Sequence, residues 1–193
     1  MAGHCYTWVD LHEAVTEDNG DLVRTILEEG TVNINELGDI DNKGTVLHNA
    51  VIRGHTDIVM VLCSVKGVEV NLQYKDGWAA LHYAAEEGHA DIVRVLCSIK
   101  GVDVNIQIKA GWTALHIAAE DGHAGIVRVL CNVEGVDVNI QNKKGWTALH
   151  YAAEGGHTDT VQELCNVEGV DVNLQNEEFR GVDCFTLCCY GRK

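Results

Sequence analysis

Residues 111–123 carry the sequence GWTALHIAAEDGH, and close variants of this stretch lie on both sides of it. A Leu-His pair recurs every 34 residues, at Leu47-His48, Leu81-His82, Leu115-His116 and Leu149-His150. A Gly-His pair keeps the same spacing, at Gly54-His55, Gly88-His89, Gly122-His123 and Gly156-His157. A fixed period of this length indicates stacked structural repeats. We therefore expect one elongated domain in which each unit contacts only its neighbours.

The unit at residues 108–141 is predicted to contain two short helices. Thr113 is the expected N-cap of the first, and Gly122 its left-handed end. Gly135 is expected to end the second, residues 136–139 to be extended, and residues 142–145 to turn into the next unit. The expected buried positions are Leu115, Ala118 and Ala119 on the first helix and Ile126, Val127, Val129, Leu130 and Cys131 on the second.

The same pattern divides the chain into four units, with the first more divergent than the others: residues 41–73, 74–107, 108–141 and 142–175. Residues 1–40 hold a degenerate N-terminal unit, in which residues 8–30 form a helical hairpin capped by Asp10. The connector at residues 31–43 is longer than its later counterparts and is expected to form an enlarged, mobile loop. Residues 176–193 are expected to form a partial C-terminal cap, with a short helix at 181–189 and a frayed tail.

The net charge of the chain limits the classes of partner that it can bind. A net charge of −15 with no basic patch argues against nucleic acid and against an anionic membrane surface, and it favours a basic protein partner. Solubility of an elongated surface explains the acidity equally well.

The cysteines indicate the redox compartment. A cysteine recurs at one position of each unit, where stacking separates neighbours by roughly 10 Å: Cys63, Cys97, Cys131 and Cys165. A disulfide needs Cα atoms within about 7 Å, so reduced thiols and an intracellular setting are expected. The start of the chain has no features of a secretory signal, and no apolar run has the length of a membrane span.

Two segments resemble the ankyrin repeat: residues 77–89, GWAALHYAAEEGH, and residues 101–105, GVDVN. The resemblance covers residues 11–175 and implies an all-α solenoid of helix-turn-helix units joined by extended turns. Alanine replaces the usual proline at Ala80, Ala114 and Ala148, and valine does so at Val46. The period is 34 residues where the family has 33, and the extra residue precedes a glycine at the end of each second helix. We expect the units to stack as in the family and the curvature of the solenoid to change.

The repeated histidines are expected to be structural. The resemblance implies that the histidine of each Leu-His pair bonds backbone in the adjacent turn, and that the histidine of each Gly-His pair caps the second helix. A zinc ladder with the repeated cysteines is disfavoured, because zinc requires four converging ligands with short spacings. Conspicuous residues occur three or four times, whereas a catalytic group should occur once, so we expect no enzyme, cofactor or metal. Cys184, Cys188 and Cys189 are taken as buried or idle thiols, with acylation or oxidative dimerisation as a minor alternative.

The remaining candidates are surface residues that stacking should align in rows. The resemblance implies that partners dock on the turn tips and first helices, which line a concave groove. One such row, formed by Trp78, Trp112 and Trp146, is expected to be exposed and to bind, although a structural brace is an equal alternative. Tyr83, Ile117 and Tyr151 vary beside it, as groove walls or packing. The proposed partner-binding residues are Lys75, Lys109 and Lys143 on the outer lip, Trp78, Trp112 and Trp146 in the middle, and Glu86, Glu87, Glu120, Asp121 and Glu154 deeper in.

The sequence thus predicts a non-catalytic protein–protein interaction module, whose partner presents apolar or aromatic surface with some basic character. The alternative is a structural spacer or self-assembling module that acts through the solenoid ends. A cytoplasmic monomer is the expected form, and a secreted effector stays open as an alternative.

Overall fold

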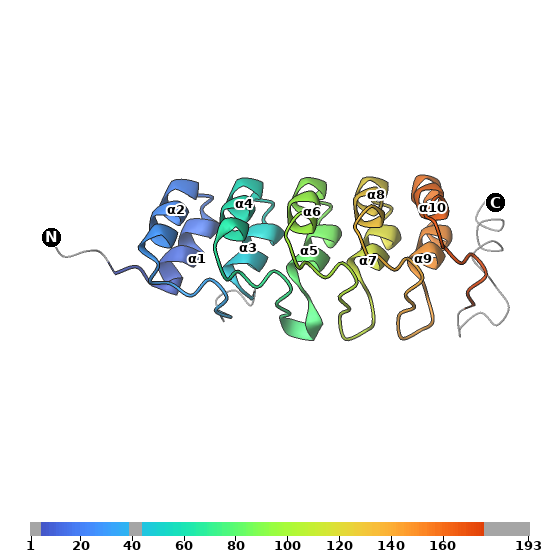
Figure 1. The fold of residues 1–193 in the computed structure, drawn as a ribbon, viewed down its shortest axis with the longest axis horizontal. Helices are drawn as coiled ribbons and strands as arrows, with labels where there is room; N and C mark the ends of the chain where they lie inside the picture. Colours follow the sequence, from blue (N-terminus) through green and yellow to red (C-terminus); the bar gives the residue numbers. More distant parts are fainter. Residues whose placement is uncertain (1–4, 39–43, 176–193) are drawn as a thin grey trace.

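The computed structural model describes residues 5–38 and 44–175 (Figure 1). The described part is helical, with no named strand and an isolated bridge between Gly38 and Gly44. A short 3-10 helix, η2, spans Lys75–Gly77. The α-helices are α1 (Trp8–Thr16), α2 (Gly20–Glu29), α3 (Val46–Ile52), α4 (Thr56–Ser64), α5 (Ala80–Glu86), α6 (Ala90–Cys97), α7 (Ala114–Glu120), α8 (Ala124–Cys131), α9 (Ala148–Glu154) and α10 (Thr158–Cys165).

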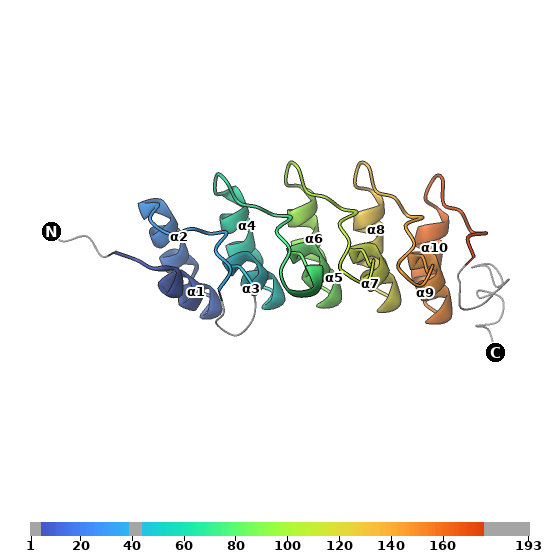
Figure 2. The ribbon, with the colours of Figure 1, turned by 90° about the horizontal axis from the view of Figure 1, so that it is seen from below.

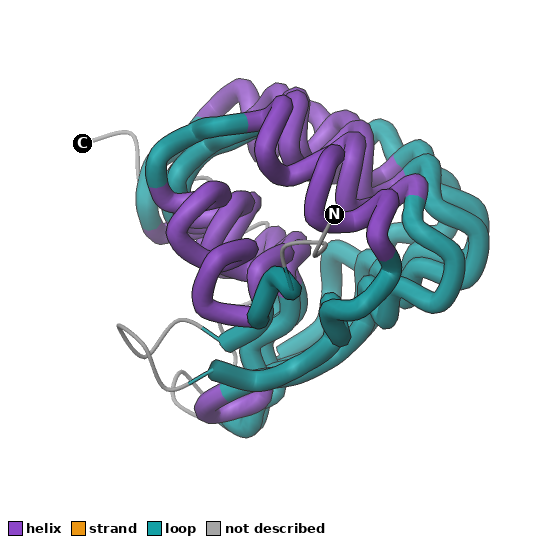
Figure 3. Tube along the Cα trace, turned by 90° about the vertical axis from the view of Figure 1, so that its left-hand side faces the viewer, coloured by secondary structure: helices purple, strands orange, loops and turns teal. Residues whose placement is uncertain are grey.

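The helices form two parallel rows along one axis. The first helices of successive units pack side by side in one row: α1, α3, α5, α7 and α9. The second helices form the other row: α2, α4, α6, α8 and α10 (Figures 1 and 2). Seen along the axis, equivalent helices and turns nearly superpose, and the turns project beyond the helices (Figure 3). The predicted all-α solenoid is confirmed. Within the described residues, no helix combines the length and apolarity needed to cross a membrane.

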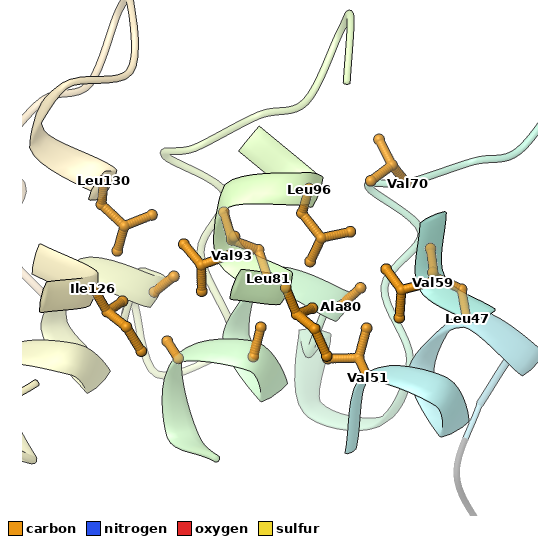
Figure 4. Packing of buried hydrophobic residues seen from close by; sticks show 14 of the residues in the cluster. Leu47, Val51, Val59, Val70, Ala80, Leu81, Val93, Leu96, Ile126 and Leu130 are labelled. Carbon is orange, nitrogen blue, oxygen red and sulfur yellow. The ribbon is translucent and has the colours of Figure 1, made fainter. Parts of the chain in front are cut away.

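The core runs through the stack as a ribbon of aliphatic side chains. Helices α4, α6 and α8 each bury an Ile-Val pair and a Leu, such as Ile92, Val93 and Leu96 in α6. These side chains meet those of the first helices and of the neighbouring unit (Figure 4). Burying one such side chain contributes about 1.5–3 kcal/mol, so every unit depends on the next for part of its stability.

Asparagine side chains link each unit to the next beside the second helices. Asn71 Nδ2 donates to Gly101 O at 2.7 Å, and Asp103 N donates to Asn71 Oδ1 at 2.9 Å. The same pair of bonds is repeated by Asn35, Asn105 and Asn139. One amide thus satisfies a carbonyl and an N–H of the following unit, which fixes the spacing of the stack.

Three local predictions need correction. The N-cap of α1 is Thr7, not Asp10, because Thr7 and the Asp10 carboxylate form a reciprocal capping box. Helix α8 ends at Cys131, so Gly135 lies in the turn that follows it, with φ 82°. Val129 and Cys131 are only half-buried, since they flank the face that carries Ile126, Val127 and Leu130.

Several expectations fall outside the described residues. These are the mobile loop, of which residues 39–43 are not described, and the partial cap at 176–193 with its short helix and its three cysteines. They stay predictions.

Candidate binding groove

The turns that precede the first helices stack on one another through their backbones. Lys109 N donates to Asp76 O at 2.7 Å, and Lys143 N donates to Ala110 O at 3.1 Å. Lys75, Lys109 and Lys143 are exposed at these tips. Lys109 Nζ lies 3.3 Å from Asp76 Oδ1, and the high exposure of both side chains leaves this ion pair screened by water. The lysines therefore lie on the outer edge of the turns, as the repeat predicts.

The histidine of each Leu-His pair is a buried anchor. Thr113 N donates to His116 Nδ1 at 3.1 Å, so Nε2 carries the proton and donates to Trp146 O at 3.0 Å. His82 bonds Ile106 O at 3.1 Å in the same way. Burial lowers the pKa of His116 and of His82 to about 4, so both are neutral near pH 7. The structural role that the resemblance implies for these two histidines is confirmed.

The histidine of each Gly-His pair does something different from the expected capping. His55, His89, His123 and His157 occupy N-cap positions but make no side-chain capping bond. Three of the rings instead lie over the left-handed glycine of the preceding unit: His89 over Gly54, His123 over Gly88 and His157 over Gly122. His157 Nε2 also lies 2.8 Å from Glu120 O. The ring is an inter-unit spacer that needs a neighbour without a Cβ.

The three tryptophans do not form a uniformly exposed row. Trp146 is 4% exposed, so the expectation of an exposed side chain is wrong there, whereas Trp78 and Trp112 are half-buried. Each tryptophan packs against a tyrosine ring: Tyr151 lies 4.8 Å from Trp146 and 4.4 Å from Trp112 between ring centroids, and Tyr83 lies 4.9 Å from Trp78. Bracing thus accounts for Trp146, and an accessible surface is left on the other two.

Trp8 occupies the same repeat position, three residues before a Leu-His leucine. The row of Trp78, Trp112 and Trp146 predicted from the sequence leaves Trp8 out, although the register of the repeat is enough to identify it. It stacks on His12, with ring centroids 5.0 Å apart, and its ring covers Gly38. Trp8 therefore braces the N-terminal unit.

Carboxylates from successive units lie near one another at the ends of the first helices. Partial burial, then the charges of Glu87 and Asp121, raise the pKa of Glu86. Partial burial, then the charges of Asp121 and Glu154, raise the pKa of Glu120, against a small opposing effect of Lys144. Within the described residues none of these five carboxylates forms an ion pair. The acidic row therefore carries mutual repulsion that a bound cation would relieve.

A groove of about 730 Å³ opens between the turn tips and the first helices, over α5 and α7. It brings together five of the predicted residues and leaves out Lys75, Lys109, Lys143, Glu87, Trp146 and Glu154. Three lining residues were not predicted: Ile108, Ala110 and His123. Ile108 had a signal in the sequence, because it stands where the other two units carry Tyr74 and Asn142. The full lining is Trp78, Glu86, Ile108, Ala110, Trp112, Ile117, Glu120, Asp121 and His123.

The repeated cysteine thiols have low reactivity near neutral pH. Burial raises the pKa of Cys63, Cys97 and Cys131 to about 11, so little thiolate forms near pH 7. Among the residues that the structure describes, no three His, Cys, Asp or Glu side chains converge as metal ligands. The groove therefore offers aromatic faces, aliphatic walls and carboxylates, which suit recognition.

A comparison with curated proteins finds no match. A family model for ankyrin repeats (three copies) matches residues 11–108 and 98–176, which together span most of the chain. The match agrees with the paired helices, the left-handed glycines and the anchoring histidines described above. The chain belongs to the ankyrin repeat family.

Proposed function

We propose that this protein binds a basic, partly apolar segment of a protein partner through the groove over α5 and α7 and the adjoining turn tips. Ankyrin repeats are generally protein–protein interaction modules, and the single observation that supports this groove is its lining. Two half-buried tryptophans lie beside carboxylates that form no ion pair among the described residues. Tryptophan is strongly enriched at binding hot spots, and unpaired carboxylates select a cationic partner.

The supporting features favour a non-catalytic role in a reducing compartment. The five cysteines within the described part of the chain are free thiols, four of them with raised pKa, as suits a protein kept among intracellular thiols. We propose that the cytoplasm is this compartment and that the protein acts there as a monomer.

A peptide-display selection tests the proposed function. A random peptide library is selected on the purified protein, and dissociation constants of enriched peptides are then measured on variants. We expect enriched peptides to combine basic and apolar residues. The double variant Glu86→Lys with Glu120→Lys should weaken their binding at least about tenfold, because it reverses the charge of the groove.

Glu134→Lys with Glu168→Lys is the matched control. It changes the net charge equally, at exposed residues that follow the second helices and do not line the groove. Equal loss in both double variants would reveal a bulk charge effect. Enrichment of acidic peptides, or unchanged binding in the groove variant, would refute the proposed function.

A further inference from the structure

The chain itself fills the space between the last two tryptophans. The Tyr151 ring lies between Trp112 and Trp146, with centroids 4.4 Å and 4.8 Å away, and is only 9% exposed. Asn142 Nδ2 donates to the Tyr151 hydroxyl at 2.8 Å. At this step of the stack, a planar group from the following unit is packed against the tryptophan of the preceding one.

One unit earlier the planar group is missing. Ile117 stands at the position equivalent to Tyr151, and Ile108 stands at the position of Asn142. An isoleucine side chain is shorter than a tyrosine ring and cannot reach across to the preceding tryptophan. Both isoleucines line the 730 Å³ groove, together with Trp78 and Trp112. The groove is therefore the space that a tyrosine ring occupies one unit later.

The charge around this space selects among planar groups. Glu86, Glu120 and Asp121 line the groove, and no lysine or arginine is among the described residues that line it. An aromatic ring would leave these carboxylates without a partner. An ammonium group would satisfy them but would not stack as a flat surface. A guanidinium is planar, cationic and able to bond carboxylates with two N–H groups, and its three methylenes suit aliphatic walls.

We propose that the groove binds one arginine side chain of the partner, with the guanidinium stacked on the tryptophans beside Glu120 and the methylenes against Ile108 and Ile117. This inference rests on the proposed function and names the residue that the groove selects. In the complex, an arginine of the partner would take the place that the Tyr151 ring of the chain itself takes one unit later. Stacking and charge act together, because a cation over a tryptophan face gains further stabilisation.

Short peptides test the inference directly. The probe is acetyl-Gly-Gly-Arg-Gly-Gly-amide, titrated into the full chain while the indole N–H resonances are followed by NMR. We expect the Trp78 and Trp112 signals to move and the Trp146 signal to move least. The citrulline peptide, which keeps the planar shape but loses the charge, should bind at least about tenfold more weakly. The lysine peptide should be weaker by several-fold.

The variant Ile117→Tyr should close the groove from within. Its ring would occupy the position that Tyr151 takes one unit later, so arginine-peptide binding should be lost while the unfolding temperature stays the same or rises. Met60→Tyr is the matched control, because it adds a tyrosine at an exposed position of α4 that does not line the groove, and it should keep binding. Glu120→Gln removes one charge without changing core volume, and it should weaken binding several-fold even if Ile117→Tyr fails to fold.

Equal binding of the arginine and citrulline peptides, stronger binding of a tyrosine peptide, or full binding by a folded Ile117→Tyr protein would overturn the inference. No binding of the arginine peptide would overturn it as well. The proposed function has a separate readout: display-selected peptides that lack arginine but still depend on Glu86 and Glu120 would uphold it while this inference fails.

Discussion

At the scale of single residues, the N-cap of the first helix in each unit shows how one threonine hydroxyl satisfies backbone and side-chain hydrogen bonds. Thr113 and Thr147 accept a bond from the backbone N–H of the histidine three residues on, and each hydroxyl lies 2.8 Å from Nδ1 of that histidine. The unit at residues 74–107 has Ala79 in this place, with nearly the same backbone angles as Thr113. Ala79 is buried and leaves these bonds unmade.

Ala79→Thr should therefore stabilise the protein by about 1 kcal/mol, the usual effect of a threonine N-cap. Urea unfolding followed by circular dichroism measures the change. Ala79→Val adds nearly the same volume without the hydroxyl and serves as the control. Equal stabilities of the two variants would mean that packing, not the capping bond, determines the effect.

At the scale of helices and turns, glycine is required where one unit meets the next. Gly122 ends the turn after α7 with φ 72°, and a Cβ there would lie 2.5 Å from the His157 ring. Gly135 also has a positive φ, 82°, but a Cβ there would contact nothing within 4 Å. Substitutions at the two positions therefore distinguish the effect of backbone strain from the effect of packing between units.

Gly135→Ala should cost about 1–2 kcal/mol, the strain of a side chain in the left-handed region. Gly122→Ala should cost more, because His157 must also move and lose its contact with Glu120 O. Chemical unfolding of the two variants gives the difference. If both lose the same stability, the ring over the glycine contributes nothing to the junction.

At the scale of the whole molecule, two columns of side chains couple the units, and one of them is the asparagine column. Asn105 makes two bonds to the next unit, at 2.7 Å and 2.9 Å. The side chain of Asn173 makes no such bond within the described residues. Asn105→Ala should cost about 1–3 kcal/mol, and Asn173→Ala distinctly less. Hydrogen exchange should locate the loss of protection at the junction between α6 and α8; an equal effect of both changes would contradict the coupling role.

The buried histidines form the second column and make stability depend on pH. Burial lowers the pKa of His48, His82 and His116 from 6.5 to about 4. The unfolded chain takes up protons below about pH 6.5 and the folded chain does not, so stability falls as the pH falls from 6.5 to 4. Each histidine accounts for on the order of 3 kcal/mol over that window. The raised pKa values of Glu86 and Glu120 act weakly in the opposite direction.

Urea unfolding at pH 7 and pH 5 should thus show a large loss of stability, with an uptake of about three protons on unfolding near pH 5. His82→Gln removes one titrating group and should reduce the steepness of the pH dependence, whatever it does to stability at pH 7. A stability that stays flat between pH 7 and pH 5 would show that these histidines are not kept neutral by the fold.

The 34-residue period was enough to predict the helical solenoid, and local patterns were enough to predict the capping role of Thr113, the left-handed Gly122 and most core positions, because each of these depends on residues a few places apart. The exposure of the tryptophans and the packing of the Gly-His rings depended on the tertiary structure. Trp112 and Trp146 have the same local sequence context, yet what covers them is set by residues on facing units. The period of 34 residues determines that such side chains meet. Only the packed stack decides that Tyr151 fills one gap between tryptophans and that Ile117 leaves the other open, because side-chain length across the junction controls the space.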